Sequence, residues 1–182
     1  MIAAESQSAK LGVWLFIAAD SMFFLGLVGA YMVLRSGQPE IFAAGALSKS
    51  LAVMEGALLL IGSAAIATAA ICNCRYRLIA ALAVALLVAI GFMAVSAGQI
   101  ARPSGPPLNG VGPMDAFHAC YFSLWTVYAV HVVAAAIAIL ILLIHAMRGK
   151  ILPAQTQLVA IYWHFLVLLW ILLFPILFLT GT

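Results

Sequence analysis

Charged side chains are scarce in this sequence: Lys, Arg, Asp and Glu together make up 7% of its 182 residues. A soluble domain typically carries about 25% charged residues. The chain is instead 67% hydrophobic with a mean hydropathy of +1.23, which excludes an ordinary soluble fold. The net charge of +3 does not indicate a nucleic-acid partner, because basic residues in the loops of a membrane protein set its topology.

Cysteine is also scarce, with only Cys72, Cys74 and Cys120 present. An odd and small number does not build a disulfide framework. A zinc site needs three or four ligands, and no further Cys or His lies close to Cys72 and Cys74 in the sequence. We therefore expect free thiols at the end of a membrane helix rather than a metal site.

Long apolar runs dominate what remains. A membrane-spanning helix needs about 20 mostly apolar residues, and Pro, Gly and charged residues concentrate between the runs, as helix breakers do. The sequence therefore predicts an all-α integral membrane protein, a bundle of five transmembrane helices that form one membrane domain over residues 1–182. The expected spans are about 11–34, 51–72, 78–100, 117–147 and 157–180.

The basic residues predict the orientation of the bundle. Five of them fall on the N-terminal side of the membrane and three on the other side, and cytoplasmic loops carry the excess of Lys and Arg. We therefore expect a cytoplasmic N-terminus and a periplasmic C-terminus. The five are Lys10, Arg75, Arg77, Arg148 and Lys150, and the three are Arg35, Lys49 and Arg102.

Two pairs of small residues predict close helix packing. Gly26 and Ala30 stand four residues apart in the first span, as do Ala65 and Ala69 in the second. Small residues at this spacing let two helix backbones approach closely in a membrane. We expect both pairs to lie at helix–helix contacts.

Asp20, Glu55, His131 and His164 are ionisable residues inside the expected spans. Such a group costs at least about 2.5–3.5 kcal/mol at mid-membrane, so it usually faces protein, water or a partner. Asp20 lies roughly 15 Å beyond Lys10 along a helix, near the bilayer centre. Glu55 lies at the outer start of its span, where partial hydration is expected. For all four, a structural hydrogen bond inside the bundle competes with any functional role.

The histidines do not predict a haem site. Bis-histidine ligation needs two histidines at similar depth, but His164 lies about 10 Å and His131 about 24 Å from the inner boundary at 1.5 Å per residue. An internal repeat typical of transporters is not visible, and neither is a nucleophile with a base at plausible spacing. These observations favour a packing or accessory subunit without catalytic residues of its own.

Aromatic residues near the expected span ends predict interfacial belts. Tyr162 and Trp163 lie near the inner end of the fifth span, and Tyr31 and Tyr121 near the outer face. Trp and Tyr are enriched at both membrane–water interfaces. On this basis we expect these rings at the headgroup level.

Four segments of the chain resemble subunit III of the haem-copper respiratory oxidases, the cytochrome c and quinol oxidases. The last segment is the most specific, because its Tyr162, Trp163, His164, Phe165 and Trp170 match the family's YWHFxDxxW motif. Asp20 stands where most cytochrome c oxidase members carry Glu, and His131 matches the second histidine of an HGxHV motif. The segments are KLGVWLFIAADSMFFLGLVGAYMVLRSG, MEGALLLIGSAA, GVGPMDAFHACYFSLWTVYAVHVVAAAIAIL and YWHFLVLLW.

The resemblance implies a five-helix bacterial member of this family in the inner membrane. It implies no metal, cofactor or catalytic residue in this chain, because the family's haems and copper belong to subunits I and II. It further implies lateral binding to subunit I and phospholipid in an internal cleft. The residues implied for the polar lining of that cleft are Asp20, Glu55, His131, Trp163 and His164.

The sequence also departs from the family pattern. Tyr128 replaces the first histidine of HGxHV, Val167 replaces the aspartate of the YWHF motif, and Gln99 replaces a glutamate at the end of the third span. These replacements indicate a divergent branch that keeps the scaffold. An accessory subunit of a nitric-oxide reductase and a small membrane haem electron carrier remain as alternatives.

Overall fold

The described residues of the computed structural model form five long helices. Each is long and apolar enough to cross a membrane, which confirms the prediction of an all-α five-helix membrane bundle. The structure describes residues 2–37, 49–72, 74–100 and 116–179. The elements are α1 (Ile2–Gly37), α3 (Lys49–Ile71), α4 (Arg75–Ile100), α5 (Ala116–Met147) and α6 (Pro153–Phe174), followed by the π-helix η1 (Pro175–Leu179).

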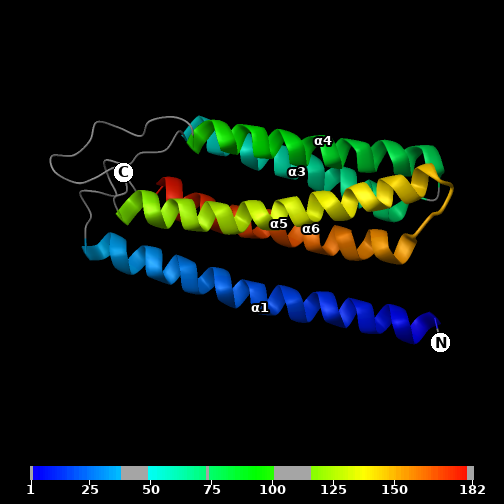
Figure 1. Cartoon of the computed structure of the whole chain (residues 1–182), viewed down its shortest axis with the longest axis horizontal. Helices are drawn as coiled ribbons and strands as arrows, with labels where there is room; N and C mark the ends of the chain where they lie inside the picture. Colours follow the sequence, from blue (N-terminus) through cyan, green and yellow to red (C-terminus); the bar gives the residue numbers. More distant parts are fainter. Residues whose placement is uncertain (1, 38–48, 73, 101–115, 180–182) are drawn as a thin grey trace.

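Four of the helices form a closed ring, and the fifth lies beside it. Helix α3 packs against α4, α4 against α5, α5 against α6, and α6 back against α3. Helix α1 packs on α5 and α6, on the far side of the bundle from α3 and α4 (Figure 1). The ring therefore holds the core, and α1 adds a flank to it.

The helix bounds differ from the expected spans mainly at the N-terminal ends of α1 and α6. Helix α1 begins at Ile2, well before the first apolar residue of its span, and α6 begins at Pro153. Proline suits the first turn of a helix, because its missing N–H would have no partner there. The same property changes the end of α6: at Pro175 the missing N–H interrupts the α-helical ladder, and the chain continues as the π-helix η1.

A narrow stripe attaches α1 to the ring. Its buried residues are spaced three or four apart, the spacing that places side chains on one helix face. The other faces of α1 are exposed and apolar, with Trp14, Met22 and Phe23 each more than half exposed. In a membrane protein such a surface faces lipid or a partner. The buried stripe consists of Ile17, Asp20, Phe24, Val28 and Tyr31.

The small-residue pairs have different outcomes. On α3, Ala69 is buried and Ala65 half-buried, as expected for a helix contact. On α1 the prediction is wrong: Gly26 and Ala30 are exposed, and no described atom lies within 4 Å of a Cβ built on Gly26. The buried stripe of α1 uses larger side chains instead, so this pair points away from the bundle.

Gly62 of α3 lies in close contact with Trp163 of α6. A Cβ built on Gly62 would lie 2.5 Å from Cζ2 of Trp163 and 3.1 Å from Cγ1 of Val88. Trp163 is fully buried, and its Nε1 donates a 3.4 Å hydrogen bond to the carbonyl of Leu59. The glycine therefore provides the space that the indole ring fills.

The turn between α3 and α4 is tied to the end of α5. Nε of Arg75 donates to the carbonyl of Ala146 at 3.0 Å, and Nη2 donates to that of Met147 at 2.5 Å. The last carbonyls of a helix lack partners within the helix, and a cation is favourable beside them. Arg75 therefore caps α5 and places the start of α4 and the end of α5 at the same end of the bundle.

We predict that Gly62→Ala destabilises the bundle by about 1–3 kcal/mol, because an added methyl group would overpack the contact with Trp163. Reversible unfolding of the purified chain in mixed detergent micelles measures the change. The matched control is Gly26→Ala, which adds the same methyl group to open space on α1. Equal stability of the two variants would contradict the packing of Trp163 on this glycine.

We also predict that Cys74 is labelled from the cytoplasmic side. The backbone N–H groups of Arg77 and Tyr76 at the start of α4 lower the pKa of the exposed Cys74 thiol, and the thiolate is the reactive form. In a Cys72→Ser/Cys120→Ser background, a membrane-impermeant maleimide should label inverted vesicles and leave intact spheroplasts unlabelled. Addition of Cys74→Ser should abolish the signal. Labelling of spheroplasts alone would reverse the predicted orientation.

Candidate functional site

Asp20 of α1 and His131 of α5 form the polar contact between the flanking helix and the ring. Oδ1 of Asp20 lies 3.0 Å from Nε2 of His131, and the Asp20 residue is 8% exposed. Within the described part of the chain, Oδ2 of Asp20 is buried without a hydrogen-bond partner. Oδ1 of Asp20 therefore joins α1 to α5, whereas Oδ2 is buried beside this contact.

The other ring nitrogen of His131, Nδ1, also makes a hydrogen bond. Nδ1 lies 2.6 Å from the carbonyl oxygen of Val127, and a carbonyl only accepts, so Nδ1 carries a hydrogen. The contact between Nε2 and Asp20 then holds one further proton, on either the imidazole or the carboxyl group. The pair keeps the same net charge in both forms, and the helix contact remains hydrogen-bonded in both.

Aromatic rings surround this pair. Phe24 packs edge-on to the His131 ring at 5.5 Å between centroids, and Phe16 lies 6.4 Å from it. Phe16 also contacts Tyr162 of α6 at 5.9 Å, and the Tyr162 hydroxyl donates to the His131 carbonyl at 3.4 Å. The polar contact therefore lies in an apolar shell built by α1, α5 and α6.

Glu55 and Ser96 form a second polar contact, between α3 and α4. Oγ of Ser96 donates to Oε1 of Glu55 at 2.5 Å, and the two residues are 0% and 1% exposed, respectively. The expectation of a partly hydrated Glu55 is therefore wrong. Its depth along α3 was inferred correctly as near one end, but the side chain points into the bundle, where α4 covers it.

His164 and Ser63 form the third contact, between α6 and α3. Nδ1 of His164 lies 2.8 Å from Oγ of Ser63. His164 is half-buried, and the neighbouring Trp163 is fully buried beside Gly62. The Trp-His pair in the last span therefore fastens α6 to α3 through one packing contact and one hydrogen bond.

The structure thus distributes the five predicted residues over three helix interfaces. Asp20 and His131 meet each other, a pairing that the depth estimates of about 15 and 24 Å did not place together. The estimate for Asp20 starts from Lys10 and that for His131 from the inner boundary, and α1 begins eight residues before Lys10. Ser63 lies in the segment MEGALLLIGSAA, but the sequence does not predict it as the partner of His164, since a serine inside an apolar run does not reveal which residue it contacts.

Tyr128, which replaces a family histidine, has its own buried contact. Its hydroxyl donates to the Leu166 carbonyl on α6 at 2.9 Å, and the residue is 1% exposed. Its ring packs against Phe92 and Trp170 at 5.7 and 5.5 Å between centroids. Tyr128 therefore links α5 to α6 through a buried hydrogen bond.

The prediction of interfacial aromatic belts is wrong for two of the four rings. Trp163 and Tyr31 are 0% and 2% exposed, because each occupies the buried face of its helix rather than the lipid-facing one. Tyr162 is half-buried against Phe16. The side chains of Tyr121 and Gln99 lie outside the described residues.

Among the described residues, no group of three or more His, Cys, Asp or Glu side chains could hold a metal ion. The three cysteines are free thiols. The predicted role of Asp20, Glu55, His131, Trp163 and His164 as the lining of a lipid cleft stays a prediction.

An apolar groove of about 570 Å³ lies where α1 meets α6 and α5. Gly12, Val13 and Phe16 line it from α1. Leu158, Val159 and Tyr162 line it from α6, and Ala134 closes it from α5. Phe16 and Tyr162 connect this groove to the Asp20–His131 contact, so the polar pair lies beside an apolar space between the flank and the ring.

The chain is similar along nearly its whole length to two curated bacterial proteins. It is 28% identical to cytochrome bo(3) ubiquinol oxidase subunit 3 of Pseudomonas putida over 192 aligned residues, which cover 97% of this chain and 88% of the relative. It is 26% identical to the protein of the same name from Pseudomonas aeruginosa, over 93% of this chain and 84% of the relative. No protein-family model matches the chain. The similarity supports the resemblance to the subunit III family.

We predict that Asp20→Ala weakens the docking of α1 by about 1–2 kcal/mol, because it leaves Nε2 of the half-buried His131 without a partner. Asp20→Asn should cost less, since an amide can donate or accept and keeps the contact. Unfolding in mixed micelles measures both.

The double variant Asp20→Leu/His131→Leu provides the control. Removal of both polar partners leaves no unsatisfied group, so it should cost less than Asp20→Ala alone. The single variants Asp20→Leu and His131→Leu complete the comparison. If the loss of stability in the double variant equals the sum of the losses in these two single variants, the two side chains do not interact.

Proposed function

We propose that this chain is the non-catalytic third subunit of a haem-copper quinol oxidase in the bacterial inner membrane. The observation that carries the proposal is the similarity over nearly the full length to two proteins named ubiquinol oxidase subunit 3. In this role the chain binds laterally to subunit I, which with subunit II holds the haems and copper, and it takes part in aerobic electron transport as a structural component.

The buried polar contacts support a role in stabilising subunit I. Each of the three joins two helices: Asp20 with His131, Glu55 with Ser96, and Ser63 with His164. Groups committed in this way hold a bundle in one arrangement. A bundle with a defined shape offers its partner a preformed surface, which lowers the entropy cost of association.

The apolar groove between α1 and α6 supports phospholipid binding. Its volume of about 570 Å³ and its lining by Gly12, Val13 and Leu158 suit an acyl chain. We propose this groove as the lipid cleft, with Asp20 and His131 beside it. In this position a bound acyl chain would fill the space between the flank and the ring.

The test is an affinity purification of the tagged chain from its native membrane in mild detergent, with optical spectra and protein identification on the eluate. We expect a large haem-bearing subunit to copurify and the complex to oxidise ubiquinol. An unrelated tagged membrane protein serves as the control. A Soret band in the isolated chain would instead indicate a haem electron carrier, and copurification with a nitric-oxide reductase would assign it to that complex.

A further inference from the structure

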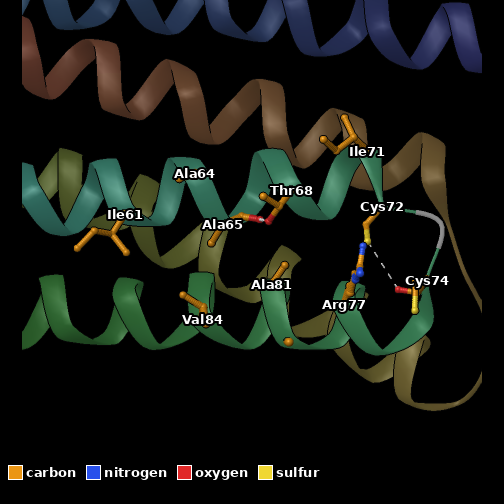
Figure 2. A pocket seen from close by; sticks show the side chains of 11 residues that line it. Ile61, Ala64, Ala65, Thr68, Ile71, Cys72, Cys74, Arg77, Ala81 and Val84 are labelled. Carbon is orange, nitrogen blue, oxygen red and sulfur yellow. Dashed lines mark hydrogen bonds between the residues drawn. The ribbon is translucent and has the colours of Figure 1, made fainter.

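A second and larger groove lies between α3 and α4. It has a volume of about 860 Å³. Small side chains form its floor, with Ala64 and Ala65 on α3 and Ala80 and Ala81 on α4. Figure 2 shows Ile61, Thr68 and Ile71 along one wall and Val84 on the other. None of these residues belongs to the polar contacts described above.

The groove has the length of one lipid leaflet. It runs along α3 from Ile61 to Ile71, at the end of the helix. Ten residues of helix measure about 15 Å, and half of the hydrocarbon core of a bilayer is also about 15 Å. The groove therefore extends from the membrane boundary to the bilayer centre, as one acyl chain does.

The boundary end of the groove is polar and basic. Arg77 lies in the first turn of α4 and extends toward Cys72 across this end (Figure 2). Among the described residues that line the groove, Arg77 is the one charged side chain and none is acidic. The neighbouring Tyr76 is 83% exposed, as expected for a ring at the headgroup level.

Arg75, the nearest other arginine, has a different task. Its guanidinium is bound to the carbonyls of Ala146 and Met147, and it does not line the groove. The hydroxyl of Thr68 is likewise bound to the Ala65 carbonyl at 2.6 Å. The polar chemistry of the groove is therefore concentrated in one guanidinium at its mouth.

We propose that this groove binds one anionic phospholipid, with an acyl chain between α3 and α4 and the phosphate on the Arg77 guanidinium. Guanidinium groups bind phosphate with two parallel hydrogen bonds, and basic pockets between membrane helices hold anionic headgroups. A neutral apolar helix from a partner would fill the groove but would leave Arg77 without an anion. The site is independent of the proposed oxidase role and separate from the cleft at α1.

Native mass spectrometry of the purified full-length chain tests the site, with phosphatidylglycerol and phosphatidylcholine added in equal amounts. We expect one tightly retained phosphatidylglycerol that Arg77→Gln weakens about fivefold, the equivalent of about 1 kcal/mol for one basic residue at an anionic surface. Arg148→Gln is the matched control, because this exposed residue lies at the same end of the bundle outside the groove.

Ala64→Phe tests the acyl part of the site. It fills the groove from an exposed position on α3, so it should reduce the retention of both lipids. Ala94→Phe makes the same change at an exposed position on α4 outside the groove and should leave retention unchanged. Melting temperatures of all four variants in detergent check that the fold is intact.

Three results would overturn the proposal. Equal losses in Arg77→Gln and Arg148→Gln would indicate general attraction of anionic lipid to a basic surface. Unchanged lipid retention in both Arg77→Gln and Ala64→Phe would show that the groove binds no specific lipid. Loss of a copurifying membrane protein from Ala64→Phe, with lipid retention unchanged, would show that a partner helix occupies the groove. A further variant, Gly12→Phe, fills the cleft at α1 and not the groove between α3 and α4. It should leave the retention of phosphatidylglycerol by the α3–α4 groove unchanged.

Discussion

Interhelical hydrogen bonds and close packing hold this bundle together. The hydrophobic effect does not drive association of helices inside a bilayer, because the lipid tails are as apolar as the helix surfaces. The structure supplies such bonds at four of the helix interfaces. Asp20–His131 joins α1 to α5, Glu55–Ser96 joins α3 to α4, Ser63–His164 joins α3 to α6, and Tyr128 joins α5 to the Leu166 carbonyl of α6. The buried polar residues therefore account for the architecture before any functional role is considered.

The four helices of the ring are held to one another by more contacts than those that attach α1 to the ring. In the ring, Gly62 admits the indole of Trp163, and Arg75 ties the start of α4 to the end of α5. Helix α1 is attached by a narrow stripe, in which the buried Asp20 contacts His131. A flank joined in this way leaves a groove at its edge, which is where the proposed lipid cleft lies. The proposed role thus follows from an uneven distribution of contacts.

The two grooves suit different tasks. The groove between α1 and α6 is almost wholly apolar and adjoins a buried polar pair, whereas the groove between α3 and α4 ends at Arg77. The first would retain a lipid by acyl packing, and the second would select for a charged headgroup. An accessory subunit that binds lipid in both grooves would present part of the bilayer to its partner as a fixed surface.

The sequence by itself determined the fold class, the number of helices and the presence of ionisable residues inside them, among them Asp20, Glu55, His131 and His164. Long apolar runs can satisfy their backbone groups in lipid only as helices, and an ionisable residue in such a run is conspicuous. The tertiary structure alone decided which residues meet. Glu55 is buried, and Gly26 and Ala30 are exposed. Trp163 is buried in the core and does not lie in the expected aromatic belt. The physical reason is that hydrophobicity is nearly uniform around these helices, so no pattern in the sequence marks the face that packs against protein and the face that meets lipid.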